Sequence, residues 1–229
     1  MKKIFINVDM QNDFVRPNGR LTIYPEKTDG SYFSYLSASK LTLSVRRIKE
    51  KFDEAVRNGN KDILWINTLD FHSQWDSELS DEPDFVKTFP PHCIAGSWGA
   101  QNVQGLELID PDFINHYGAG FVNEADLQST TQELVFTKDV FSIWDGNPNF
   151  RELMQFFVKE DTEIYIFGVT TQICVHAAVK GFFENFKNPK VFVVEDCIAP
   201  IQEIPVDPVY DEWKQLGISG FIKQNEVII

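Results

Sequence analysis

Residues 163–186 have the sequence EIYIFGVTTQICVHAAVKGFFENF, and this stretch decides the fold. The run Glu163–Phe167 is rich in β-branched and aromatic side chains, which predicts a short buried strand that ends at a glycine. Thr170 or Thr171 can cap a helix, and the apolar residues that follow recur at helical spacing. The stretch therefore predicts a strand, a turn and a helix, with Cys174 in the first helical turn.

A cysteine at the start of a helix is a candidate nucleophile. Free backbone N–H groups and the positive end of the helix dipole converge there, so they favour a thiolate and can bind an oxyanion. The alternative is that Cys174 is a small buried apolar side chain, as free cysteines usually are. The turn alone does not decide between these two interpretations.

The rest of the chain alternates strand-like and helix-like segments. Apolar runs predict further strands at Lys3–Val8, Asp62–Asn67, Leu106–Ile109, Glu133–Thr137 and Lys190–Val194, with one or two more in Gly220–Ile229. Helical spacing predicts helices at Ser39–Arg57, Phe150–Lys159 and within Pro205–Leu216. We expect an α/β fold with a mainly parallel central sheet of about six strands and helices on both faces. No linker or repeat interrupts the chain, so we expect one domain over residues 1–229.

Composition excludes several classes of partner. The formal net charge is −13 and the pI is near 4.7, so nucleic acid and anionic membrane surfaces would be repelled. The chain has three cysteines, and we find neither a secretory segment nor an apolar stretch long enough to span a bilayer. We therefore expect a cytoplasmic protein with reduced thiols. The sequence leaves open whether it forms a homo-oligomer.

Three reactive residues follow predicted strands. Asp9, Lys138 and Cys174 each lie at the carboxyl end of a different strand. These ends share one edge of a parallel sheet, where ligands bind in open α/β folds, so the three side chains can converge. The alternatives are that Asp9 caps a turn and that Lys138 is an ordinary solvated lysine.

A second group of residues suggests a metal site. Asp70 and His72 are two positions apart, so in extended chain their side chains project to the same side. His92 follows two prolines that fix the backbone. Mixed carboxylate and imidazole ligands suit zinc, iron or manganese better than calcium or magnesium. The alternative is that Asp70 and His72 are a chance surface pair and that most of the acids at positions 76–84 are simply solvated.

With these residues in place, the chain resembles the isochorismatase-like cysteine hydrolases and, within them, the nicotinamidases. The resemblance rests on five blocks that occur in family order across most of the chain: Val8–Phe14, Asp70–His72, Pro90–Cys93, Lys138 and Gly168–Val175. It implies a three-layer α/β/α fold and a catalytic triad of Asp9, Lys138 and Cys174, with Cys174 as the nucleophile. It also implies a cis peptide between Val169 and Thr170, and an oxyanion hole made by the backbone N–H groups of Thr170 and Cys174.

The resemblance further implies metal ligands at Asp70, His72 and His92. Many relatives have a histidine near Glu78 and others a glutamate, so Glu78 is our candidate for the remaining ligand, with Asp76 and Asp84 as rivals. The residues implied around the substrate ring are Phe14, Phe89, Trp144 and Val169, where family members often have a tryptophan at the position of Phe89. The stretches 16–39 and 110–132 are longer than is usual in the family, and the sequence does not indicate their role.

The implied function is that of a metal-dependent nicotinamidase, an amidohydrolase that converts nicotinamide to nicotinate and ammonia through a cysteine thioester in NAD salvage. The implied cofactor is one divalent transition metal, zinc first, with iron or manganese as alternatives. Two other functions stay open: a related hydrolase of a carbamoyl or ureido amide, and a catalytically silent binding protein of the same fold. We expect His176 to be turned away from Cys174 by helical geometry, and Cys93 and Cys197 to take no part in catalysis.

Overall fold

A parallel sheet organises the computed structural model, which describes residues 1–25, 33–109, 111–117 and 132–229. Within these residues the sheet has seven strands in the order β3-β4-β2-β1-β5-β6-β7, and every pairing is parallel. The strands are β1 Lys3–Val8, β2 Ile63–Asp70, β3 Asp112–Ile114, β4 Glu133–Lys138, β5 Glu163–Val169, β6 Lys190–Ala199 and β7 Gly220–Ile222. The α/β fold predicted from the sequence is confirmed.

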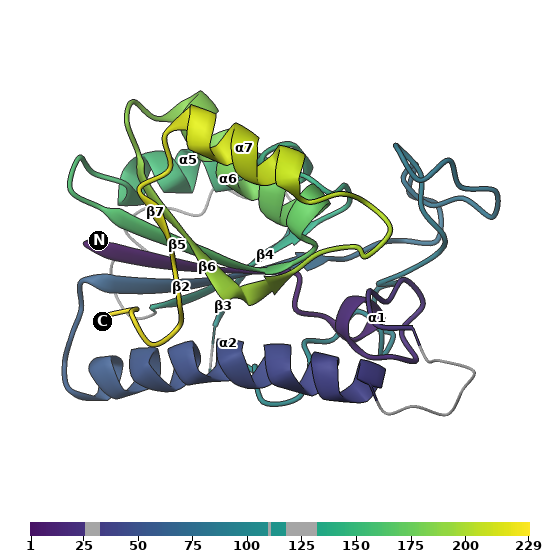
Figure 1. Ribbon diagram of the computed structural model, residues 1–229, viewed down its shortest axis with the longest axis horizontal. Helices are drawn as coiled ribbons and strands as arrows, with labels where there is room; N and C mark the ends of the chain where they lie inside the picture. The colour runs from purple at the N-terminus through teal and green to yellow at the C-terminus, as the bar shows by residue number, and fades with distance from the viewer. Residues whose placement is uncertain (26–32, 110, 118–131) are drawn as a thin grey trace.

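Helices cover both faces of this sheet, as predicted. Figure 1 shows α2 on one face and α5, α6 and α7 on the other, which gives three layers. The helical segments are α1 Asn12–Val15, α2 Phe33–Arg57, α4 Ile143–Gly146, α5 Pro148–Phe157, the π-helical turn η1 Thr171–Val175, α6 His176–Asn185 and α7 Asp207–Leu216. Among the described residues, no helix is long and apolar enough to cross a membrane.

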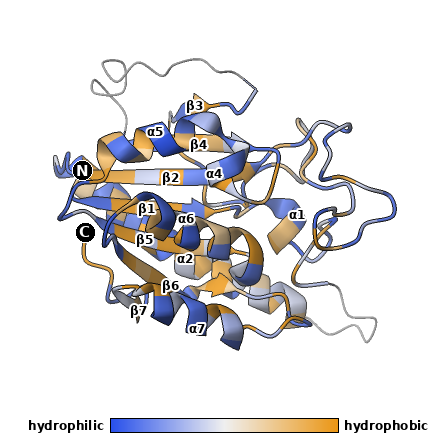
Figure 2. Ribbon diagram, turned by 90° about the horizontal axis from the view of Figure 1, so that it is seen from above, coloured by the Kyte–Doolittle hydropathy of each residue, from blue (hydrophilic) through white to orange (hydrophobic). Residues whose placement is uncertain are grey.

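The central strands are buried along almost their whole length. Every residue of β2 and β4 is buried, as are all but the first residues of β1 and β5. Figure 2 shows how hydrophobic residues gather along these strands. A strand that is covered on both faces needs apolar side chains on both, which is why these segments are continuous rather than alternating apolar runs.

The prediction of a strand at Leu106–Ile109 is wrong. Gly105 has φ +93° and donates its N–H to the side chain of Glu107, so the chain turns locally instead of extending. Leu106 is buried, but Ile109 is exposed. The edge strand is instead the three-residue β3, which pairs with β4 and buries only Ile114. An edge strand with one buried residue has no apolar run that sequence analysis can detect.

The two long stretches singled out in the sequence are only partly described. In the stretch 16–39, helix α2 begins at Phe33, six residues before the predicted start at Ser39. Residues 26–32, 110 and 118–131 lie outside the described part of the chain, and they include most of the stretch 110–132.

Candidate active site

The structure brings together the three side chains that the sequence predicted to converge. Asp9 follows β1, Lys138 is the last residue of β4, and Cys174 lies in η1 after β5. Lys138 Nζ is 2.9 Å from Asp9 Oδ2. The Sγ atom of Cys174 and carboxylate oxygens of Asp9 and Asp70 all lie within 4.8 Å of one another. All of these residues are buried.

The backbone at the ends of β1 and β5 holds Asp9 and the nucleophile turn in place. Asp9 adopts φ +50°, and its Oδ1 atom accepts a 2.6 Å hydrogen bond from the hydroxyl of Thr68 on β2. Gly168 approaches β1 so closely that a Cβ atom there would lie 2.0 Å from the carbonyl oxygen of Val8. Glycine is therefore required immediately before the turn that carries Cys174.

Burial changes the expected charge of the nucleophile. Burial raises the pKa of the Cys174 thiol well above its ordinary value; Lys138 opposes this shift, and the carboxylates of Asp9 and Asp70 add to it. Burial therefore favours the thiol at rest, because desolvation outweighs the opposing effects of the helix terminus and the lysine. Burial also raises the pKa of Asp9 against the opposing effect of Lys138, which makes Asp9 a better proton acceptor than an exposed aspartate.

Lys138 is held as a cation despite its burial. Burial alone lowers the pKa of its ammonium group, but the carboxylates of Asp70 and Asp9 outweigh burial and raise that pKa well above its ordinary value. The lysine is therefore a fixed positive charge between two carboxylates, not the solvated side chain of the alternative interpretation.

The turn after β5 has the backbone geometry that the family resemblance implied. The peptide between Val169 and Thr170 is cis. The carbonyl of Thr170 accepts hydrogen bonds from the N–H groups of Ile173, at 3.2 Å, and Val175, at 3.1 Å, and the second of these is the five-residue bond of a π turn. Thr170 and Cys174 both line the pocket described below.

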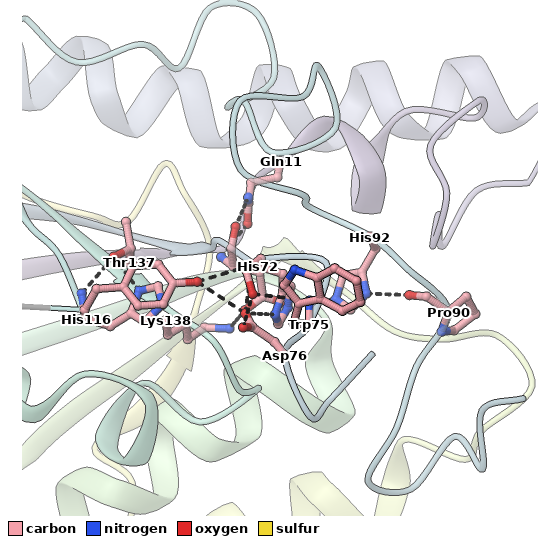
Figure 3. A network of polar contacts seen from close by, with 12 residues as sticks. Gln11, His72, Trp75, Asp76, Pro90, His92, His116, Thr137 and Lys138 are labelled. Carbon is pink, nitrogen blue, oxygen red and sulfur yellow. Dashed lines mark hydrogen bonds and ion pairs between the residues drawn. The ribbon is translucent and has the colours of Figure 1, made fainter. Parts of the chain in front are cut away.

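Beside these residues lies a cluster that could hold a metal ion. Ligand atoms of Asp70, His72 and His92 lie within 4.8 Å of one another, and all three residues are buried. Nδ1 of His92 is 2.8 Å from the carbonyl oxygen of Pro90, which leaves Nε2 directed at Asp70, 3.4 Å from Oδ2. Figure 3 shows His92 between His72 and Pro90, with a dashed line from His92 to Pro90.

Buried polar atoms in this cluster lack partners among the described residues. Neither ring nitrogen of His72 makes a hydrogen bond, and Oε2 of Glu78 makes none. Unpaired buried polar atoms are costly, and a cation bound among two imidazoles and carboxylates would satisfy them. The residues present therefore fit a divalent transition metal.

Of the three candidate acids, Glu78 alone lines the pocket beside Asp70 and His92. Burial and the neighbouring Asp70 raise the pKa of Glu78 to about 7. Asp84 is exposed and accepts hydrogen bonds from the N–H groups of Val86, Lys87 and Thr88, so it closes a surface turn.

Asp76 lies behind His72 rather than in the pocket. Its Oδ2 atom is 3.4 Å from His72 Nδ1, and its carboxylate accepts hydrogen bonds from the N–H and hydroxyl of Ser73 at 2.9 Å and 2.5 Å. This position suits a residue that orients the imidazole.

A cavity of about 350 Å³ is lined by Cys174 from the candidate triad and by Asp70 and His92 from the candidate metal cluster. Phe14, Phe89 and Val169 line it, as the sequence predicted. The rings of Phe14 and Phe89 lie 5.3 Å and 6.3 Å from that of His92 between centroids. Apolar lining residues that sequence reasoning did not assign to the site are Leu21, Ile23, Pro25, Phe85, Phe141, Ile173, Ile201 and Ile204.

The prediction that Trp144 lines the pocket is wrong. Its indole packs edge-on against Phe150 and Phe182 in the core, and its Nε1 donates a 3.2 Å hydrogen bond to the carbonyl of Ala178. A Cβ atom at Gly181 would lie 2.1 Å from this indole, so α6 has a glycine where the ring inserts. Phe141 lines the pocket from the same segment, and the spacing from Lys138 does not distinguish the two aromatics.

His176 contacts helix α7 and does not line the pocket, in agreement with the prediction that it is turned away from Cys174. Nδ1 of His176 accepts a 3.1 Å hydrogen bond from Trp213 Nε1 on α7, and its Nε2 is 3.5 Å from Glu212 Oε2. Cys93 and Cys197 are buried and are absent from the pocket lining.

Comparison with known proteins gives the class of this chain. The isochorismatase domain matches residues 110–215, which include Lys138 and Cys174. The nicotinamidase of Saccharomyces cerevisiae is 26% identical over 227 residues, covering 95% of this chain and 98% of that protein. The chain thus contains a match to the isochorismatase domain over residues 110–215. Over nearly its whole length it is similar to a nicotinamidase.

Solved structures share the fold. The pyrazinamidase of Pyrococcus horikoshii in complex with zinc has a TM-score of 0.66 at 21% identity, covering 97% of this chain and 99% of that one. The N-carbamoylsarcosine amidase of Thermoplasma acidophilum has a TM-score of 0.61 at 18% identity, covering 100% and 99%. These two proteins act on different amides, so the fold alone does not identify a substrate.

Proposed function

We propose that the protein is a metal-dependent nicotinamidase that hydrolyses nicotinamide to nicotinate and ammonia. The observation that carries the proposal is that Asp9, Lys138 and Cys174 lie directly beside Asp70, His72 and His92, with Lys138 paired to both Asp9 and Asp70. The similarity to the yeast nicotinamidase over nearly the whole chain supports the same substrate. Nicotinate formed in this way would return the pyridine ring to NAD synthesis.

In the first half-reaction Cys174 is the nucleophile. Its Sγ attacks the amide carbonyl carbon while Asp9, whose raised pKa makes it a better base, accepts the thiol proton. The fixed charge of Lys138 stabilises the anionic states beside it. The backbone N–H groups of Thr170 and Cys174 would bind the oxyanion. Asp9 then passes its proton to the departing nitrogen, and ammonia leaves a thioester on Cys174.

The second half-reaction hydrolyses the thioester. Asp9 accepts a proton from the attacking water, whose oxygen bonds to the acyl carbon. The C–S bond breaks, and the proton held on Asp9 returns to Sγ, so the thiol of Cys174 is regenerated. The second proton of the water stays on the carboxylic acid and is lost to ammonia or solvent as nicotinate is released.

Asp70, His72 and His92 would hold the metal, with Glu78 as the remaining protein ligand. Two imidazoles with carboxylates favour zinc, and iron or manganese are the alternatives. When bound, the ion supplies a Lewis acid and a binding point for a ring nitrogen. Phe14 and Phe89 offer aromatic surfaces for the flat ring.

The charge of the pocket favours nicotinamide over N-carbamoyl acids. None of the described residues lining it is a lysine or arginine, whereas Asp70, Glu78 and Glu203 are acidic. A substrate with its own carboxylate, such as N-carbamoylsarcosine, would find no lysine or arginine there to pair with, whereas neutral nicotinamide needs none.

The test is ammonia release from nicotinamide by the purified protein as isolated, after chelation, and after zinc, iron or manganese is restored. We expect release that chelation abolishes and one metal restores, with N-carbamoylsarcosine hydrolysed far more slowly. Absence of release with every metal would refute the proposal. Faster turnover of the carbamoyl compound would favour the related amidase activity, and tight nicotinamide binding without turnover a binding protein.

A further inference from the structure

The side chain of Gln172 ties the nucleophile turn to a separate segment of the chain. Gln172 lies in η1, two residues before Cys174. Its Nε2 donates hydrogen bonds to the carbonyls of Ile201, at 3.0 Å, and Ile204, at 2.8 Å. Its Oε1 accepts a 2.9 Å hydrogen bond from the N–H of Ile201. One amide therefore makes three hydrogen bonds to the loop between β6 and α7, which Figure 1 shows at the carboxyl edge of the sheet.

The same loop is a wall of the substrate pocket. All four residues from Ile201 to Ile204 line the cavity, although none belongs to a strand or helix. The one backbone hydrogen bond that joins its two ends, from Ile204 N–H to Ile201 O, is long at 3.3 Å. Segments with few bonds of their own sample several conformations, so the position of this wall depends on Gln172.

We propose that Gln172 is a positioning residue that fixes the 201–204 wall against the nucleophile turn and thereby sets the affinity for substrate. The inference rests on the proposed function and adds a determinant of substrate binding to it. Without the amide, binding must order the segment, and that entropic cost appears in KM. Gln172 does not contact the reacting atoms, so kcat, which depends on Asp9, Lys138 and Cys174, stays nearly unchanged.

The test compares Gln172→Ala with a matched control, Gln132→Ala. Gln132 also donates two hydrogen bonds to backbone carbonyls, those of Asn60 and Ile63 at 2.9 Å and 2.8 Å, but it lies at the amino ends of β2 and β4. Gln172→Glu is a second variant, since a carboxylate keeps the bond from Ile201 N–H and loses both donors. The readouts are KM, kcat and hydrogen exchange of the peptide that contains residues 201–204.

For Gln172→Ala we expect KM for nicotinamide to rise about tenfold, with kcat within about twofold of wild type, and faster exchange in the 201–204 peptide. Gln172→Glu should be intermediate, and Gln132→Ala should leave KM and this peptide unchanged. An unchanged KM, a fall in kcat alone, or an equal rise in KM for Gln132→Ala would overturn the inference. If the wild type releases no ammonia, the proposed function fails, and exchange alone then decides whether Gln172 fixes the wall.

Discussion

Asp70 and Lys138 are register partners at the ends of β2 and β4, and their side chains form a buried ion pair. The other oxygen of Asp70 lies 3.4 Å from His92 Nε2. Burial would raise the pKa of Asp70, but Lys138 and His92 outweigh it and hold that pKa well below its ordinary range. One ionised carboxylate therefore belongs both to the lysine of the candidate triad and to the candidate metal cluster.

This shared pair makes Lys138 important for stability. Replacement by methionine leaves Asp9 and Asp70 buried without their cation, and we expect a loss of about 3–5 kcal/mol in the free energy of unfolding. Urea unfolding measures it. The control is Lys180→Met, because Lys180 is half exposed and its ion pairs with Glu184 and Glu212 are long, at 4.0 Å and 3.8 Å. That change should stay within about 0.5 kcal/mol. Equal losses for the two variants would contradict the buried pair.

Cys174→Ala should abolish ammonia release, lowering kcat by about 10³-fold or more, because no other nucleophile takes its place. The variant should fold normally, which circular dichroism checks. Cys197→Ala is the matched control, since Cys197 is equally buried but lies in β6 away from the pocket. Near-wild-type kcat in Cys174→Ala would move the nucleophile elsewhere.

His92→Ala should lose bound metal while the fold is retained, because the imidazole lines the pocket with its Nε2 atom 3.4 Å from Asp70 Oδ2. Elemental analysis of the purified variant measures the metal. Glu78→Gln should lower the metal content less severely, and Asp84→Asn, which changes an exposed turn, should not lower it. Undiminished metal in His92→Ala would rule out that ligand, and a larger effect of Asp76→Asn than of Glu78→Gln would make Asp76 the ligand.

How much of the fold and of the candidate site could be predicted from the sequence depends on where each residue lies in the sheet. Asp9, Lys138 and Cys174 end strands whose continuous apolar runs are easy to recognise, and parallel pairing brings such ends together without further information. The edge strand β3 left no such run because it buries one side chain.

Contacts between distant segments were not predictable. The spacing of Phe141 and Trp144 does not reveal which ring enters the pocket, because the choice depends on the space left by Gly181 on α6. Gln172 forms hydrogen bonds with residues 29 and 32 positions further along the chain, and no local sequence pattern predicts such bonds. The turn alone does not determine the charge of Cys174, because burial, which raises the pKa of its thiol, is a property of the packed site.

The pH dependence of stability should carry a contribution from His176. Burial lowers its pKa below the ordinary 6.5, and Glu212 opposes the shift. The unfolded chain therefore binds the proton more readily, so the stabilisation by His176 is present above pH 6.5 and is lost as the pH falls towards the folded pKa. His176→Gln removes the acceptor for Trp213 and should lower Tm at pH 7.5. The difference in Tm between wild type and variant should shrink at pH 5. A difference that grows on acidification would mean that His176 is charged in the fold and paired with Glu212.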